Sequence, residues 1–173
     1  MLSAARRLAE AGGARRFVLG LAPTVDRSVV GPILRAGGGP AVETVQGRTY
    51  EVMAGADAVL VASGTATLEA ALLGAPMVVC YRVSRLTEVA ARALGRIPWI
   101  SLPNIIAGRA IVPEILQREV TGDRLAAEAR RLIEDPVAAT GQRTAFKDIR
   151  ARLGESGVGR RAALAVLRAA RLA

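Results

Sequence analysis

Hydrophobic residues along this chain follow two alternating patterns. Short runs rich in valine and leucine are typical of buried strands, and longer stretches in which apolar residues recur every three or four positions are typical of amphipathic helices. Glycine and proline separate the segments, as at Gly12-Gly13 and Pro23. The pattern predicts strands at 16–22, 41–45, 58–62 and 77–81, and helices at 2–11, 26–34 (capped by Asp26), 48–56, 65–73 and 84–94.

The pattern is weaker between residues 99 and 120 and becomes clear again afterwards. A helix begins at Thr121, with Asp123 in its positively charged first turn, and Pro136 follows it. The remaining predicted segments are a short apolar piece at 99–102, a loop at 104–109, a short helix at 112–117, and two C-terminal helices broken at 154–159.

Strands separated by helices at this spacing predict an α/β fold with a parallel, doubly wound, Rossmann-like sheet. We expect this domain to occupy residues 1–136, followed by a C-terminal helical tail at 137–173. Such sheets bind ligands at the loops that leave the carboxyl ends of their strands.

Composition narrows the function classes. The 173 residues are 51% hydrophobic and 3% aromatic, which is typical of a globular domain built from alanine, valine and leucine. The formal charge is +9, almost all from arginine, because Lys147 is the only lysine. A nucleic-acid-binding module would cluster its arginines with interleaved aromatics, whereas these arginines are scattered, so we expect no nucleic acid partner.

The absence of histidine excludes Ser-His-Asp and Cys-His catalysis, histidine-ligated zinc and a histidine base. Cys80 is the only cysteine, so no disulfide framework exists and a reducing compartment is expected. No Asp-x-Asp metal motif is present, and we expect neither metal nor cofactor. The uncharged stretches are too short to cross a bilayer, which predicts a soluble chain that is at most peripheral to a membrane.

The stretch "VLVASGTATLEAALLGAPMVV" at 59–79 carries the most informative chemistry. A strand ends in Ser63-Gly64-Thr65, where a helix begins, and the first N–H groups of that helix suit an anion such as phosphate. Gly64 lets the backbone approach the anion, and the hydroxyls of Ser63, Thr65 and Thr67 add donors. Glu69 lies on the helical face of Thr65 and could accept bonds from a ribose diol. Phosphate and diol together indicate a nucleotide.

A plain structural interpretation of the same residues stays open on local chemistry alone. In it Ser63 is an N-cap, Thr65 and Thr67 are ordinary early-helix residues, and Glu69 is solvated. The turn matches neither the Walker loop, which needs its lysine, nor the glycine fingerprint of dinucleotide-binding domains.

Three longer segments add a resemblance. "ADAVLVASGTATLEAALLGAPMVVCYRVS", "WISLPNIIAGR" and "VPEILQ" together resemble the lipid-A-disaccharide synthase family, inverting glycosyltransferases of the two-Rossmann-domain GT-B type. The likeness runs in order from "RFVLGLAPTVD" to "LIEDP". It implies that this chain is the C-terminal, UDP-sugar-binding half. The family transfers 2,3-diacylglucosamine from its UDP donor to 2,3-diacylglucosamine 1-phosphate, giving lipid A disaccharide 1-phosphate and UDP.

The resemblance also implies site residues. Its diphosphate loop corresponds to Ser63, Gly64, Thr65 and Thr67, and its ribose contact to Glu69. The further positions that it implies at the interdomain cleft are Asn104 and Gln117 for donor hydrogen bonding, Arg109 for phosphate charge, and Glu114. The alternatives are a surface arginine at 109 and a solvated charge at 114.

The chain departs from the family pattern at its start. The family's N-terminal domain is missing, and with it the acceptor site and the acidic residue expected to act as base. The glycine-serine-arginine segment and the strand before the first helix are missing too. In the strand order 3-2-1-4-5-6 that strand is central, so its loss leaves two unpaired edges. We therefore expect a truncated or split product that needs the missing domain or forms a homo-oligomer.

The last helix, "GRRAALAVLRAARL", places Leu164 and Leu167 on an apolar face between arginines, and we expect that face to pack on the missing domain. Two other interpretations remain: another UDP-N-acetylglucosamine-type GT-B enzyme or epimerase, and a non-catalytic nucleotide-binding fragment. The resemblance implies a cytoplasmic protein with peripheral contact to the inner face of the inner membrane.

Overall fold

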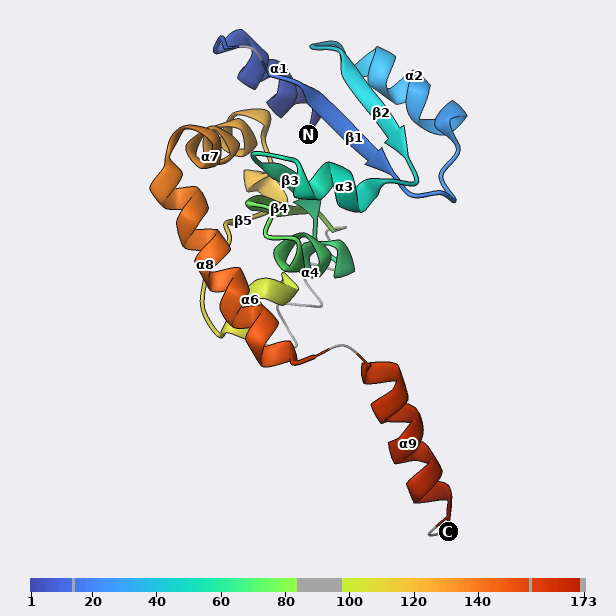
Figure 1. Ribbon diagram of the computed structural model, residues 1–173. Coiled ribbons are helices and arrows are strands. Elements are labelled where there is room, and N and C mark those ends of the chain that lie inside the picture. The colour runs from blue at the N-terminus through green and yellow to red at the C-terminus, as the bar shows by residue number, and fades with distance from the viewer. Residues whose placement is uncertain (14, 84–97, 156, 172–173) are drawn as a thin grey trace.

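The computed structural model describes residues 1–13, 15–83, 98–155 and 157–171 (Figure 1). The strands are β1 (Phe17–Leu21), β2 (Val42–Gln46), β3 (Val59–Ala62), β4 (Met77–Tyr81) and β5 (Glu114–Leu116). The helices are α1 (Leu2–Glu10), α2 (Arg27–Gly37), α3 (Thr49–Ala54), α4 (Thr65–Leu72), α6 (Leu102–Ala107), the 3-10 turn η1 (Gln117–Glu119), α7 (Gly122–Glu134), α8 (Pro136–Leu153) and α9 (Val158–Arg171). The helix predicted at 84–94 lies outside the described residues.

Every strand pair in the described part of the chain is parallel. β1 pairs with β2, and β4 lies between β3 and β5. Four of these strands fall within one residue of their predicted ends, and Asp26 caps α2 by accepting from the Ser28 N–H at 2.8 Å. The predicted α/β class with a parallel, doubly wound sheet is confirmed.

The sheet is interrupted between β1 and β3. The two-stranded and three-stranded parts share no ladder hydrogen bonds in the described residues, so one edge of β1 and one edge of β3 face the interruption. The expectation that a central strand is missing between them stays a prediction.

Helices cover both faces of the three-stranded part. Alternate residues of a strand point to opposite faces, and Met77, Val78 and Val79 of β4 all have 0% exposure. Met77 and Val79 join a cluster with residues of α4 and α8, whereas Val78 joins a cluster with residues of α1 and α7 (Figure 1). β4 is therefore the centre of the core.

Strands beside the interruption are less covered than β4. Val59 and Leu60 of β3 are only partly buried, and Val18 of β1 is 39% exposed. Central strands of a parallel sheet normally bury such apolar side chains, so these residues are less buried than their type and position in the sheet favour.

The prediction of a loop at 104–109 is wrong for most of that segment, because α6 runs from Leu102 to Ala107. Ser101 takes the N-cap position with extended backbone, and Pro103 lies in the first turn, where its missing N–H has no cost. Gly108, with φ of 67°, ends the helix. Pro103 thus begins a helix here and does not disrupt one.

The prediction of a short helix at 112–117 is also wrong. Glu114–Leu116 form β5, which pairs with β4 from Val79 to Tyr81, and η1 follows. The segment is short and Pro113 precedes it, so local propensity is weak and pairing with β4 decides its conformation.

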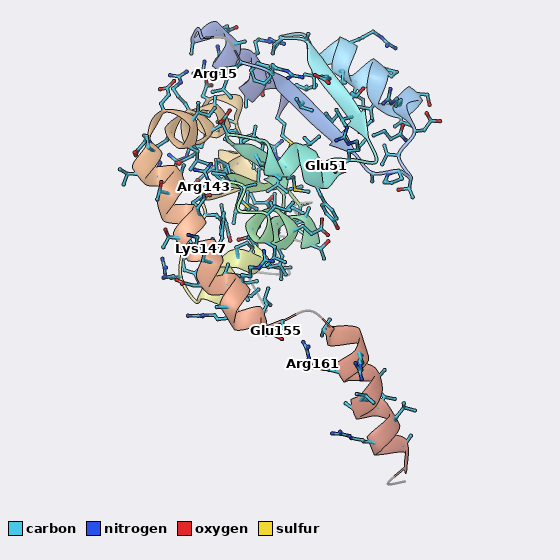
Figure 2. All side chains as sticks on the ribbon, in the orientation of Figure 1. Arg15, Glu51, Arg143, Lys147, Glu155 and Arg161 are labelled. Carbon is cyan, nitrogen blue, oxygen red and sulfur yellow. The ribbon has the colours of Figure 1, made fainter. Side chains whose placement is uncertain are left out.

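The two C-terminal helices differ in their packing. α8 lies across α4 and α6, and its Phe146 and Ile149 belong to the core. α9 extends away from the body with the described side chains exposed, and at its start the Arg161 Nη2 donates to the Glu155 carbonyl at 3.1 Å (Figures 1 and 2). The boundary at residue 136 between a sheet domain and a C-terminal helical tail stays a prediction.

Candidate nucleotide-binding site

The Ser63-Gly64-Thr65 turn lies at the carboxyl end of β3, where α4 begins. Gly64 has φ of 157°, which residues with a side chain rarely adopt, and no atom lies within 4 Å of the position that a Cβ would take. The backbone φ angle is therefore the reason for a glycine here, because a Cβ would have enough space. The open space in front of it leaves room for a ligand to reach the backbone.

Backbone N–H groups at this turn are only partly used. The Ser63 N–H donates to the Cys80 carbonyl at 3.2 Å, and the Thr67 N–H donates to the Gly64 carbonyl at 3.1 Å. The N–H groups of Gly64, Thr65 and Ala66 lie ahead of the first intrahelical bond and have no partner among the described residues. Together with the positive end of the helix dipole they suit an anion.

The three predicted hydroxyls have different surroundings. Ser63 Oγ donates to the Ile100 carbonyl at 3.0 Å, and Thr67 Oγ1, fully buried, donates to the Gly64 carbonyl at 2.7 Å. Thr65 is exposed, and its hydroxyl has no partner within the described parts of the chain. The hydroxyl that remains free for a ligand is therefore that of Thr65, while the other two bond within the fold and shape the turn.

Glu69 follows one turn into α4 and is half-buried. Its side chain makes no hydrogen bond or ion pair with any residue that the structure describes. Its carboxylate accepts only, so a diol is a suitable partner and a second anion is not.

Glu114, the first residue of β5, is the acceptor at the centre of a polar cluster. Its Oε1 accepts from the Ser101 N–H at 2.9 Å, the Ser101 hydroxyl at 2.6 Å and Asn104 Nδ2 at 2.8 Å. Its Oε2 accepts from the Ile100 N–H at 2.9 Å. These residues (Ile100, Ser101, Asn104 and Glu114) form what we call the Glu114 cluster.

The side chain of Asn104 is completely used by the fold. It has 0% exposure, its Oδ1 accepts from the Ile111 and Val112 N–H groups at 2.7 and 3.0 Å, and its Nδ2 donates to the Val112 carbonyl at 3.0 Å as well as to Glu114. Asn104 therefore holds the turn after α6 and has no group left to bind a sugar directly.

Gln117 lies at the carboxyl end of β5 with φ of 51°, the only positive φ of a non-glycine residue in the described chain. Its Oε1 accepts from the Val83 N–H at 2.8 Å, and its carbonyl accepts from Arg82 Nε at 3.3 Å. Gln117 thus ties together the segments that follow β4 and β5. Strained backbone of this kind is concentrated at functional sites.

Arg109 lies elsewhere. It lines an open groove against α8 with Thr140, Gly141 and Asp148. This part of α8 flanks Gln142, whose side chain accepts from the Met77 N–H at 2.8 Å and donates to its carbonyl at 3.1 Å, at the amino end of β4. Hydrogen bonds through Ile100 link Ser63 to Glu114 and so to Asn104, whereas Arg109 lies outside this network.

Sequence reasoning missed Ser101 and Gln142. The Ser-Leu-Pro sequence before Asn104 was the available signal, because serine at an N-cap followed by proline in the first turn marks a helix start. Nothing local marks Gln142, whose partner is 65 residues away.

Among the described residues no group of three or more histidine, cysteine, aspartate or glutamate side chains could hold a metal ion. In the same residues no helix is long and apolar enough to span a membrane.

A parallel sheet with helices on both faces, and a helix N-terminus with open donors at its carboxyl edge, define a Rossmann-like domain of the nucleotide-binding type. A family model described as lipid-A-disaccharide synthetase matches residues 39–167, and the chain belongs to this family. The resemblance found in the sequence is thereby confirmed.

Curated relatives carry the name lipid-A-disaccharide synthase. The chain is 48% identical over 167 residues to the protein of Anaeromyxobacter dehalogenans strain 2CP-C. This aligned region covers 96% of the chain and 44% of the relative. The identity is 41% to the protein of Myxococcus xanthus and 39% to that of Geobacter sulfurreducens, with 43% of each relative covered. The chain spans less than half the length of these relatives.

Proposed function

We propose that this chain is the nucleotide-sugar-binding part of a glycosyltransferase that makes lipid A disaccharide. Family membership and the name that the relatives carry support this activity. The observation that carries the proposal is the open N-terminus of α4, where three N–H groups and the Thr65 hydroxyl have no partner among the described residues and no atom lies within 4 Å of the Cβ position of Gly64.

The proposed donor is UDP-2,3-diacylglucosamine. Its diphosphate gains negative charge as the sugar leaves, and preorganised N–H groups at a helix N-terminus stabilise that charge. Glu69, one turn further along α4, accepts bonds from the ribose diol. The proposed acceptor is 2,3-diacylglucosamine 1-phosphate, and the products are lipid A disaccharide 1-phosphate and UDP.

The acceptor site and the base that deprotonates the acceptor hydroxyl belong, in this proposal, to a second domain. Glycosyl transfer needs the hydroxyl, the base and the anomeric carbon within reach of one another. The larger part of each relative lies outside the match with this chain, which supports that assignment.

In this proposal a further parallel strand of the same nucleotide-binding domain, and not of the second domain, fills the interruption between β1 and β3. The part-exposed apolar residues of β3 and the unpaired strand edges support it. A homo-oligomer is the other arrangement that would cover these edges. We place the enzyme in the cytoplasm, with peripheral contact to the inner face of the inner membrane, because both proposed substrates carry acyl chains.

The donor site is tested by titrating the labelled chain with UDP and following its backbone amide resonances. We expect the largest shifts at Gly64, Thr65 and Ala66, and their loss in Gly64→Ala. Gly74→Ala is the matched control, because Gly74 also has positive φ and open space around its Cβ position but lies at the other end of α4. Shifts confined to other segments, or none at millimolar UDP, would refute the site.

A further inference from the structure

The Glu114 cluster contains one carboxylate and four donors. No arginine or lysine of the described residues pairs with Glu114, although its side chain is partly buried. A carboxylate withdrawn from water is costly unless hydrogen bonds replace its hydration, and here four donors do so. Since a carboxylate accepts only, all four donors are oriented toward it.

The cluster fixes the start of α6 to the sheet. Glu114 pairs with Val79 in the ladder between β5 and β4, and Val79 has 0% exposure, so the backbone that carries the carboxylate is held at the core. From there it binds the N–H groups of Ile100 and Ser101. The chain that enters α6 is therefore positioned by a rigid strand.

Ile100 connects this cluster to the proposed ligand loop. Its N–H donates to Glu114, and its carbonyl accepts from Ser63 Oγ, so one peptide segment is held on both sides. β3, which ends at Ala62, and β5 are not neighbours in the sheet, because β4 separates them. The relay Glu114–Ile100–Ser63 thus links two strand ends that share no ladder.

We propose that Glu114 is a positioning residue for the nucleotide site. By holding Ile100 it fixes the carbonyl that orients Ser63, and thereby the turn that presents the Gly64 and Thr65 N–H groups. Glu114 acts through the relay and does not touch the ligand. This inference rests on the proposed function.

Glu114→Gln is the sharpest variant. Its amide oxygen keeps the place of Oε1, where three donors converge, and its NH2 group then faces the Ile100 N–H, so two donors meet and the relay is cut at that bond alone. Ser63→Ala cuts the relay at its other end. Glu119→Gln removes the same charge from an exposed position in η1 and is the matched control.

The experiment measures binding of UDP and of uridine, which lacks the diphosphate, to the wild type, to each single variant and to the double variant. We expect Glu114→Gln and Ser63→Ala each to lower the affinity for UDP by roughly fivefold, the scale of one hydrogen bond. Uridine affinity should stay unchanged in both. The double variant should lose no more than the stronger single variant, because both changes break one relay.

Three outcomes would overturn the positioning role. Glu114→Gln and Glu119→Gln could bind UDP with the same affinity, or a relay variant could lose as much affinity for uridine as for UDP. In the third, the two single-variant losses of UDP affinity multiply in the double variant. A general loss of structure would lower the affinities for both UDP and uridine. The ratio of the two affinities therefore distinguishes a positioning role from an effect on folding. If Glu114→Gln does not fold, Ser63→Ala decides by the same ratio. A wild type that binds no UDP overturns the proposed function, whereas a binding wild type without selective loss overturns only the role of Glu114.

Discussion

Side chains around the α4 N-terminus differ in how much of their hydrogen-bonding capacity the fold already uses. Thr67 and Asn104 are buried with their polar atoms bonded, whereas Thr65 and Glu69 have no partner in the described chain. Groups with unused capacity beside open backbone donors are the ones that a ligand can engage. The proposed contact between Glu69 and the ribose is therefore the sharpest single-residue test.

Replacing Glu69 by alanine should weaken UDP binding by about 1.5–3 kcal/mol, the usual contribution of hydrogen bonds to a charged group. Calorimetric titration with UDP and with an analogue that lacks both ribose hydroxyls measures the two affinities. Glu69→Ala should leave the affinity for the analogue unchanged. Glu119→Ala controls for the change in charge. Equal losses for the two ligands would mean that Glu69 does not contact the ribose.

Burial raises the pKa of the Cys80 thiol above its usual value. A raised pKa keeps the folded thiol protonated while the unfolded thiol ionises, so its contribution to stability is complete below about pH 8.5 and is lost as the pH rises through the folded pKa. Urea unfolding at pH 7.5 and 9.5 should show this decrease, and Cys80→Ala should abolish the difference.

The same burial protects Cys80 from reagents. At pH 8 a water-soluble disulfide reagent should modify the native chain at least roughly tenfold more slowly than the urea-unfolded chain, because the thiolate is the nucleophile. Rapid modification without urea would contradict the buried position.

Residue types at the strand ends were predictable from the sequence, but their partners were not. A serine, a glycine and threonines after an apolar run indicate a helix start with open donors, and the structure has that turn. The bond between Asn104 and Glu114 was not foreseeable, since it depends on α6 and β5, both of which were wrongly predicted. Donor hydrogen bonding by Asn104 and the cleft position of Glu114 came from resemblance, which carries residue identity but not hydrogen-bond partners.

Elements with strong periodicity formed as predicted, whereas short ones were decided by their neighbours. β5 has three residues and exists because β4 offers an edge. α8 was predicted as a helix, yet nothing in its pattern indicated that Gln142 would bond to the backbone of Met77. This contact anchors α8 at the amino end of β4.

Gln142→Ala should lower the free energy of unfolding by about 1–3 kcal/mol, because it leaves the buried N–H and carbonyl of Met77 without partners. Urea denaturation followed by circular dichroism measures the change. Gln46→Ala is the matched control: Gln46 also donates to backbone carbonyls, those of Pro23 and Val25, but at an exposed position. Equal effects of the two changes would show that the Met77 contact adds nothing.

At the scale of the whole molecule, the chain offers one proposed binding surface and an interrupted sheet. Exposed apolar residues of α9, including Val166 at 68% and Leu167 at 55%, add a second uncovered surface. Surfaces of this kind favour association. Parallel pairing was predictable from the alternation of strands and helices. The projection of α9 was not, because an amphipathic pattern does not tell what covers its apolar face.

The purified chain should make no lipid A disaccharide from radiolabelled donor and acceptor, and it should form oligomers at micromolar concentration in light scattering. Adding the unmatched part of the Anaeromyxobacter dehalogenans relative should restore synthesis if that part supplies the acceptor site. Disaccharide made by these 173 residues alone would refute the division of labour between two domains.

The interruption of the sheet also divides the folding of the molecule. β1 and β2 share no hydrogen-bond ladder with β3, β4 and β5, so the two parts are coupled through side chains, such as Phe17 in the α1–α7 cluster and the Arg15–Glu134 ion pair at 2.8 Å. Weakly coupled parts open as separate cooperative units. Amides of β1 and β2 should therefore exchange with deuterium through partial opening, while those of β4 exchange only when the whole chain unfolds. A strand inserted between the two parts would merge them into one unit, and the exchange of β1 would then slow to the rate of β4.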